Sequence, residues 1–234
     1  MSDRNIALVT GGNRGIGLQV VKELLHADFE VVLSCRKVEQ GREATRAWGS
    51  LLEHLNFLEL DVSDSNRVVQ AAEQFGKLFE RLDVLVNNAG ILLDASESIL
   101  SVSQEVIEQT IDTNSLGPLR VTKSFLPYLR KSQDARVINV SSLAGQLSSM
   151  GSWAPAYSMS KTTLNAVTCL LSNELSSEGI TVNSVSPGWI KTEMGGADAT
   201  GTLEEGADTI LWLATEASPD LTGQFLRDRE STEW

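Results

Sequence analysis

The sequence is poor in the residues that build disulfide frameworks and metal centres. It contains two cysteines, Cys35 and Cys169, and two histidines, His26 and His54, in 234 residues. Neither cysteine belongs to a CxxC pair and both lie in apolar surroundings, so we expect free thiols and a reducing compartment. The two histidines are flanked by loop or helix-surface residues, and we predict that the protein binds no metal.

Long apolar segments and excess positive charge are also absent. No apolar run approaches the ~18 residues that suggest a membrane-spanning helix. The N-terminus shows no signal-peptide pattern, because residues 6–9 already read as a strand. The formal net charge is -12, which would repel phosphate backbones and anionic membranes. We therefore expect a cytoplasmic protein with no nucleic-acid partner and no membrane partner.

Short apolar segments alternate along the chain with longer amphipathic ones. The expected strands are residues 6–9, 31–33, 57–60, 84–86, 137–140 and 181–185. Several are apolar throughout, which is typical of strands buried on both faces of a parallel sheet. Because parallel neighbours need right-handed crossovers, the pattern predicts an α/β doubly wound parallel sheet of about seven strands with helices on both faces. No low-complexity linker or repeat divides the chain, so residues 1–234 are expected to form a single domain.

Apolar residues at helical spacing predict the helices between these strands. Stripes over residues 16–25 and 68–82 each form one face of a helix. Residues 103–131 are expected to form a long helix that is bent near Gly117, and residues 156–177 form another. The loosest segments all follow carboxyl ends of strands, where this architecture binds ligands; they are residues 92–100, 147–155 and 195–202.

A glycine-rich turn joins the first expected strand to the first helix, with the spacing T-G-x-x-x-G-x-G over residues 10–17. Glycines let the backbone turn tightly and approach a pyrophosphate closely, and the helix N-terminus supplies unpaired N–H groups. An ordinary strand-to-helix turn is the alternative interpretation. We predict that a dinucleotide binds at Gly11, Asn13, Arg14, Gly15, Ile16 and Gly17.

Further motifs follow in a fixed order: Asp61-Val62, Asn87-Asn88-Ala89-Gly90, Asn114, Ser142, Tyr157-x-x-x-Lys161 and Pro187-Gly188. With the glycine turn, this set resembles the short-chain dehydrogenase/reductase superfamily over essentially the whole chain. Residues 187–196 are similar to its carbonyl reductases in particular. The resemblance implies a Rossmann fold that binds a nicotinamide dinucleotide and transfers hydride.

The resemblance also assigns cofactor contacts. Asp61 and Val62 would line the adenine pocket, and Asn88, Ala89 and Gly90 would let the ribose lie against the backbone. Thr192 would contact the nicotinamide carboxamide. The remaining positions that it implies near the nicotinamide are Pro187, Gly188 and Ile190.

Two arginines indicate which dinucleotide binds. NAD-specific folds place an acidic residue at the end of the second strand to bond the ribose hydroxyl. Here that strand ends at Arg36 with no carboxylate, and Arg14 lies nearby in the glycine turn. Guanidinium groups form charge-assisted bonds with a 2′-phosphate. We therefore predict NADPH, although both arginines could instead be solvated surface charges.

Tyr157 and Lys161 are four residues apart on an expected helix, so they share one face. The nearby ammonium is expected to lower the pKa of the phenol and make it usable as an acid and base. The resemblance gives Ser142 the task of holding the substrate oxygen, with Ser141 as a rival one residue away. It also gives Asn114 a water that bridges to Lys161.

Ser142 and Tyr157 lie somewhat further apart than the resemblance implies, so residues 145–155 are expected to bulge. Trp153, Trp189, Met150 and Leu92 flank the expected pocket and could form an apolar wall, or simply pack. The long insertion of the monomeric carbonyl reductases is absent, which favours a homodimer or homotetramer through the two long helices.

The sequence thus predicts an NADPH-dependent oxidoreductase that reduces a small carbonyl compound (an aldehyde, ketone or quinone). One alternative is an NAD(P)-dependent alcohol dehydrogenase working oxidatively. Another is a non-catalytic NADPH-sensing regulatory protein. All four catalytic positions are filled, which disfavours the sensor. Fold alone does not fix function, and the substrate stays open.

Overall fold

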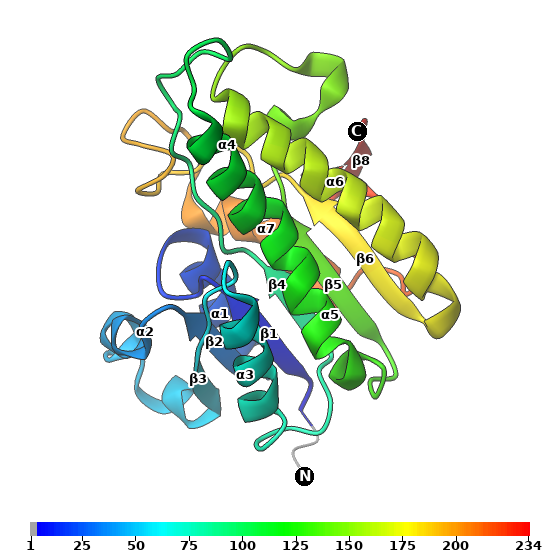
Figure 1. Ribbon diagram of the computed structural model, residues 1–234. Helices are drawn as coiled ribbons and strands as arrows, with labels where there is room; N and C mark the ends of the chain where they lie inside the picture. Colours follow the sequence, from blue (N-terminus) through cyan, green and yellow to red (C-terminus); the bar gives the residue numbers. More distant parts are fainter. Residues whose placement is uncertain (1–3) are drawn as a thin grey trace.

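The computed structural model describes residues 4–234 and contains one eight-stranded sheet (Figure 1). Its strands are β1 (Ile6–Thr10), β2 (Glu30–Cys35), β3 (Leu55–Glu59), β4 (Val84–Asn87), β5 (Ala135–Val140), β6 (Ile180–Val185), β7 (Phe225–Arg227) and β8 (Glu230–Thr232). The spatial order is β3-β2-β1-β4-β5-β6-β7-β8, and only the last pair is antiparallel. The predicted domain begins with residues 1–3, which lie outside the described residues.

The doubly wound α/β fold is confirmed, and each of the six expected strands is present. A short hairpin of β7 and β8 completes the far edge of the sheet. The two residues of its turn, Asp228 and Arg229, have φ values of 52° and 63°. Such a two-residue loop with positive φ matches the right-handed twist of the strands that it joins.

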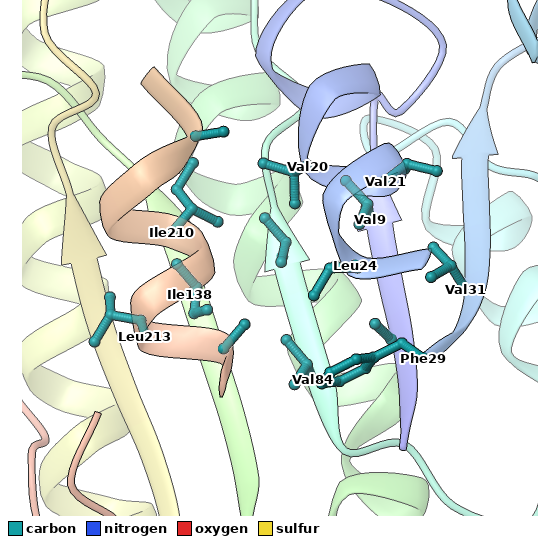
Figure 2. Close-up of a cluster of buried hydrophobic side chains, with 14 of the residues drawn as sticks. Val9, Val20, Val21, Leu24, Phe29, Val31, Val84, Ile138, Ile210 and Leu213 are labelled. Atoms are coloured by element: carbon teal, nitrogen blue, oxygen red, sulfur yellow. The ribbon is translucent and has the colours of Figure 1, made fainter. Parts of the chain in front are cut away.

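Helices cover both faces of the sheet. They are α1 (Gly15–His26), α2 (Val38–Thr45), α3 (Ser65–Phe75), α4 (Gln104–Ile111), α5 (Gly117–Leu129), α6 (Pro155–Leu175) and α7 (Leu203–Thr215). Side chains of α1 and α7 pack on one face, as Figure 2 shows for Val20, Leu24, Ile210 and Leu213. Helices α3, α5 and α6 contribute to the core on the other face. No helix within residues 4–234 is both long and apolar enough to cross a membrane.

Two of the predicted helices have other bounds in the structure. The helix expected over residues 68–82 ends at Phe75, because Gly76 follows at the C-cap. A Cβ at Gly76 would lie 2.2 Å from Tyr128 Oη, and that hydroxyl donates to the carbonyl oxygen of Ala72 at 2.9 Å. The missing side chain of Gly76 therefore lets α5 pack closely on the end of α3.

The helix expected over residues 103–131 is divided rather than simply bent. Between α4 and α5 lies one π-helical turn, Asp112–Leu116, just ahead of Gly117 and Pro118. Proline lacks the N–H of a regular helical hydrogen bond, and wide turns of this kind often mark functional positions. The π-helical turn carries Asn114, one of the predicted site residues.

Candidate functional site

The glycine turn between β1 and α1 has the backbone that a pyrophosphate site needs. Gly11 and Gly15 have φ values of 64° and 54°, which are unfavourable for residues with a side chain. A Cβ at Gly17 would lie 2.4 Å from Nδ2 of Asn88 and 2.5 Å from the Gly11 carbonyl oxygen. Arg14, at the N-cap of α1, makes no side-chain capping bond, so backbone N–H groups at this helix end can receive an anion.

The end of β4 holds this turn in place. The Asn88 amide donates to the carbonyl oxygens of Thr10 and Gly11, at 2.9 and 3.2 Å. The backbone N–H of Ala89 donates to Thr10 Oγ1 at 3.0 Å. The missing side chain of Gly90 leaves space in which a Cβ would be 3.8 Å from Lys161 Nζ. The predicted ribose wall therefore lies between the glycine turn and Lys161 of α6.

The two predicted phosphate-binding arginines differ in their surroundings. Arg36 is exposed and follows β2 directly. Arg14 forms an ion pair with Glu193, across the gap between the glycine turn and the loop that follows β6. Both partners are largely exposed, and such pairs contribute little to stability, so a phosphate can compete for the guanidinium. Asn13 donates to Gln40 Oε1 at 3.4 Å.

The carboxylate of Asp61 accepts hydrogen bonds from the N–H and the hydroxyl of Ser63, at 3.0 and 2.6 Å. The structure thus shows it as a turn aspartate. Val62 is buried, and a Cβ at Gly117 would meet its side chain at 3.0 Å. These contacts fix the wall of the expected adenine pocket.

The loop after β6 lies over the glycine turn. Gly188, which follows Pro187, has a φ of 85°, and Ile190 is buried. A Cβ at Gly15 would lie 3.3 Å from Cγ2 of Thr192. Together with the turn and the arginines, this loop forms a site that fits a nicotinamide dinucleotide phosphate.

Tyr157 and Lys161 occupy successive turns of α6, as their spacing predicts, and both are buried, with 9% and 4% exposure. The Lys161 ammonium donates to the carbonyl oxygen of Val140 at 2.8 Å, at the end of β5. It lies 5.5 Å from the centre of the Tyr157 ring. The lysine is therefore held next to the phenol and next to the space beside Gly90.

Burial dominates the electrostatics of this pair. Desolvation raises the pKa of Tyr157 to about 12, although a hydrogen bond with Ser142 opposes the rise. Desolvation also lowers the pKa of Lys161 to about 8. The expectation that Lys161 lowers the pKa of Tyr157 is therefore wrong for this structure, because loss of solvent around the phenolate outweighs other effects. The phenol of Tyr157 therefore keeps its proton at neutral pH.

The structure brings Ser142 rather than Ser141 to the phenol. Ser142 lies close enough to the phenol to lower the pKa of Tyr157, whereas the Ser141 hydroxyl donates to Asn165 Oδ1 at 2.7 Å, inside the core. Gly145, three residues after Ser142, packs against α6 so closely that a Cβ would lie 2.5 Å from the Lys161 carbonyl carbon. The missing side chain of Gly145 therefore lets the loop after β5 approach α6 closely.

Asn114 lies beside this group. Its Oδ1 accepts from the backbone N–H of Ile91 at 2.8 Å, and its Nδ2 donates to the Ile91 carbonyl oxygen at 2.9 Å. Nδ2 also lies 3.0 Å from the Ser160 hydroxyl. The side chain therefore joins the π-helical turn, the loop after β4 and α6, and a Cβ at Gly90 would be 3.3 Å from its Oδ1.

Sequence reasoning missed two features around the site. Asp94 is fully buried and hydrogen-bonds to the start of α6. The C-terminal segment braces the loop after Ser142, since Gln146 Nε2 donates to the Glu233 carbonyl oxygen at 2.9 Å and Leu147 N to that of Trp234 at 3.2 Å. No motif marks either feature, because both depend on contacts between residues far apart in the sequence.

The cysteine, histidine and acidic side chains within residues 4–234 form neither a disulfide nor a metal cluster. Both cysteines are free thiols. Within residues 4–234, no three histidine, cysteine or acidic side chains come together as a metal site would require. His54 Nδ1 lies 3.3 Å from a Glu30 carboxylate oxygen, away from the glycine turn and α6.

The chain is similar to known proteins in sequence and in overall structure. Residues 5–202 match the family model described as short chain dehydrogenase. The NADPH-bound carbonyl reductase from chicken fatty liver superposes with a TM-score of 0.91 at 30% identity, over 99% of this chain and 94% of that one. The carbonyl reductase Sniffer of D. melanogaster gives 0.90 at 30% identity, over 99% and 100%. The (+)-neomenthol dehydrogenase of Arabidopsis thaliana is 31% identical over 89% of this chain and 90% of its own. The chain therefore belongs to the short-chain dehydrogenase family of oxidoreductases.

Proposed function

We propose that this protein is an NADPH-dependent carbonyl reductase, which converts a small aldehyde, ketone or quinone to the alcohol. One observation carries the proposal: the buried phenol of Tyr157 lies beside the buried Lys161, whose ammonium is 5.5 Å from the ring centre, with Ser142 close to the phenol. A neutral phenol suits reduction, which consumes a proton, better than oxidation, which needs a base. Similarity to the NADPH-bound chicken carbonyl reductase supports the same direction.

The cofactor would be held by the residues that surround the glycine turn. Arg14 and Arg36 would bind the 2′-phosphate, Asp61 and Val62 the adenine, and Thr192 the carboxamide. Backbone N–H groups at the start of α1 would bind the pyrophosphate. When bound, NADPH supplies the hydride for the carbonyl carbon. The other contacts proposed for it are Gly11, Asn13, Gly15, Ile16, Gly17, Asn88, Ala89, Gly90, Pro187, Gly188 and Ile190.

The catalytic residues act on the substrate oxygen. Ser142 and Tyr157 donate hydrogen bonds to it, and these strengthen as negative charge develops there. Tyr157 then transfers its proton to the oxygen. Lys161 binds the ribose hydroxyls, and Asn114 holds the water through which the proton is restored.

The direct test is an NADPH-oxidation assay with a panel of aldehydes, ketones and quinones. We expect turnover of at least one carbonyl, with NADPH preferred over NADH. Tighter binding of NADH together with faster alcohol oxidation would favour an oxidative dehydrogenase. Tight NADPH binding with no turnover across the panel would contradict catalysis and favour a sensor.

Trp153 is the residue best placed to select the substrate. The residue is 52% exposed, and its ring meets the Tyr157 ring edge-on, with centroids 5.9 Å apart. An aromatic carbonyl at Tyr157 would therefore contact an aromatic face, and such pairs contribute about 0.5–1.5 kcal/mol. We expect Trp153→Ala to raise KM for aromatic carbonyls about 2- to 10-fold, with little change for small aliphatic ones.

Steady-state kinetics with matched aromatic and aliphatic aldehydes test this prediction. Trp153→Phe keeps an aromatic face and is the matched control, so it should retain most of the preference. Equal changes in KM for both aldehydes in Trp153→Ala would show that the ring only packs.

Exposed apolar residues near the two long helices could form an interface between copies of this chain. Leu116, Met159 and Leu170 are exposed apolar residues at the π-helical turn and on α6, in the region of the two long helices. We propose a cytoplasmic homodimer or homotetramer through this region. Sedimentation analysis tests it, and a monomer at micromolar concentration would contradict it.

A further inference from the structure

Asp94 lies on the loop that follows β4, between the ribose wall and the start of α4. The side chain is fully buried, with 0% exposure. Its Oδ2 accepts hydrogen bonds from the backbone N–H groups of Ala156 at 2.5 Å and Tyr157 at 3.4 Å. A carboxylate from a distant part of the chain therefore binds the first turn of the helix that carries the proton donor.

The start of α6 needs such a partner. Its N-cap is Ala154, which has no side-chain acceptor and a left-handed backbone with φ 45°. Pro155 follows and has no N–H. The first N–H groups of the helix are thus those of Ala156 and Tyr157, and Asp94 receives both. It replaces the serine, threonine, asparagine or aspartate that usually caps a helix from within.

Capping a helix with a buried carboxylate carries a large desolvation cost. A buried carboxylate loses its hydration and requires hydrogen bonds in return. Oδ1 of Asp94 has no hydrogen-bond partner among the described residues. An exposed cap, such as Asp64 on α3, which accepts from Asn66 N and Arg67 N at 2.9 and 3.2 Å, avoids that penalty. Burial of Asp94 is therefore better explained by where it places α6.

The loop that carries Asp94 also carries the ribose wall. Gly90 and Ile91 precede it by a few residues, and the Ile91 backbone is fixed by the side chain of Asn114. Asp94 forms the second connection between this loop and the catalytic region. The two connections determine how far the Tyr157 backbone lies from the space beside Gly90.

We propose that Asp94 is a positioning residue for Tyr157. It holds the first turn of α6 against the loop after β4, so that the phenol lies correctly next to the nicotinamide ribose site. The role in catalysis rests on the proposed function, but the connection itself does not. A misplacement of ~1 Å can lower a rate by about 100-fold.

The test compares Asp94→Ala, Asp94→Asn and Asp64→Ala. We expect Asp94→Ala to lower kcat about 10- to 100-fold while the Kd for NADPH changes less than about 3-fold, because most of the cofactor site is on other elements. Asparagine keeps an acceptor oxygen, so Asp94→Asn should recover at least part of the lost kcat. Asp64→Ala removes an ordinary cap and should lower the melting temperature without changing kcat.

Amide hydrogen exchange supplies a readout that needs no activity. Exchange of the backbone over residues 156–161 should accelerate in Asp94→Ala, less in Asp94→Asn, and not in Asp64→Ala. This result would support the connection even if the wild type reduced no carbonyl. Unchanged exchange, a wild-type kcat in Asp94→Ala, or an Asp94→Asn no better than alanine would overturn the proposal.

Discussion

Replacing Tyr157 with phenylalanine is expected to lower kcat for carbonyl reduction by about 100- to 10,000-fold, the usual contribution of a positioned acid. The substitution removes only the hydroxyl, so the ring stays packed against Trp153 and the helix is preserved. NADPH should still bind, because the phosphate and adenine contacts lie on other elements. Fluorescence titration measures binding, and NADPH oxidation measures turnover.

The chain contains a matched control. Tyr128 is its only other tyrosine, and its hydroxyl donates to the Ala72 carbonyl oxygen at 2.9 Å, where α5 packs on α3. Tyr128→Phe removes the same atom far from the glycine turn and should leave kcat unchanged. Full activity in Tyr157→Phe, or an equal loss in both variants, would remove Tyr157 as the proton donor.

The pH dependence of kcat/KM should report the protonation states of Tyr157 and Lys161. Tyr157, with a pKa raised to about 12, stays protonated throughout the neutral range. Lys161 carries its charge below its pKa of about 8 and loses it above. Since both groups act in their protonated forms during reduction, kcat/KM should be flat near neutrality and fall as the pH rises past about 8. A fall toward acid over the neutral range would contradict this assignment.

Replacing Arg14 and Arg36, the two proposed 2′-phosphate ligands, should have the second large effect, on the affinity for NADPH. A hydrogen bond to a charged group contributes about 1.5–3 kcal/mol, or roughly 10- to 150-fold in affinity. We expect Arg36→Ala to raise the Kd for NADPH within that range. Arg14→Ala should have the smaller effect, because Arg14 must first leave its ion pair with Glu193. The double variant should bind NADPH no better than NADH.

Affinity for NADH provides the internal reference, because NADH lacks the 2′-phosphate. Its Kd should change little in either single variant. Arg130→Ala is the matched control: Arg130 pairs with Glu178 at the end of α5 and should leave both affinities unchanged. If the double variant kept its preference for NADPH, other residues would have to bind the phosphate.

Much of the fold could be predicted because its signals are local. Strands such as β1 and β4 are short, mostly apolar runs, and steric contacts explain the spacing of the glycines in the turn. A Cβ at Gly17 would collide with Asn88, which explains why that position carries no side chain. The four-residue spacing of Tyr157 and Lys161 likewise predicts their shared face.

What could not be predicted depends on contacts between distant residues. Strands β7 and β8 have three residues each, and their turn, Asp228-Arg229, lacks the Asn-Gly signal of a tight hairpin. The end of α3 depends on the close approach of Tyr128 to Gly76. The raised pKa of Tyr157 depends on burial, which the spacing of two residues does not reveal.

A crystal structure of the protein with NADP⁺ bound tests the central claim most directly. We expect Tyr157 Oη to lie within hydrogen-bond reach of a carbonyl oxygen whose carbon is placed ~3–3.5 Å from C4 of the nicotinamide. Lys161 Nζ should contact the ribose hydroxyls. A phenol that points away from the ring, or a nicotinamide that lies outside the space beside Gly90, would contradict the assignment of Tyr157 as the proton donor.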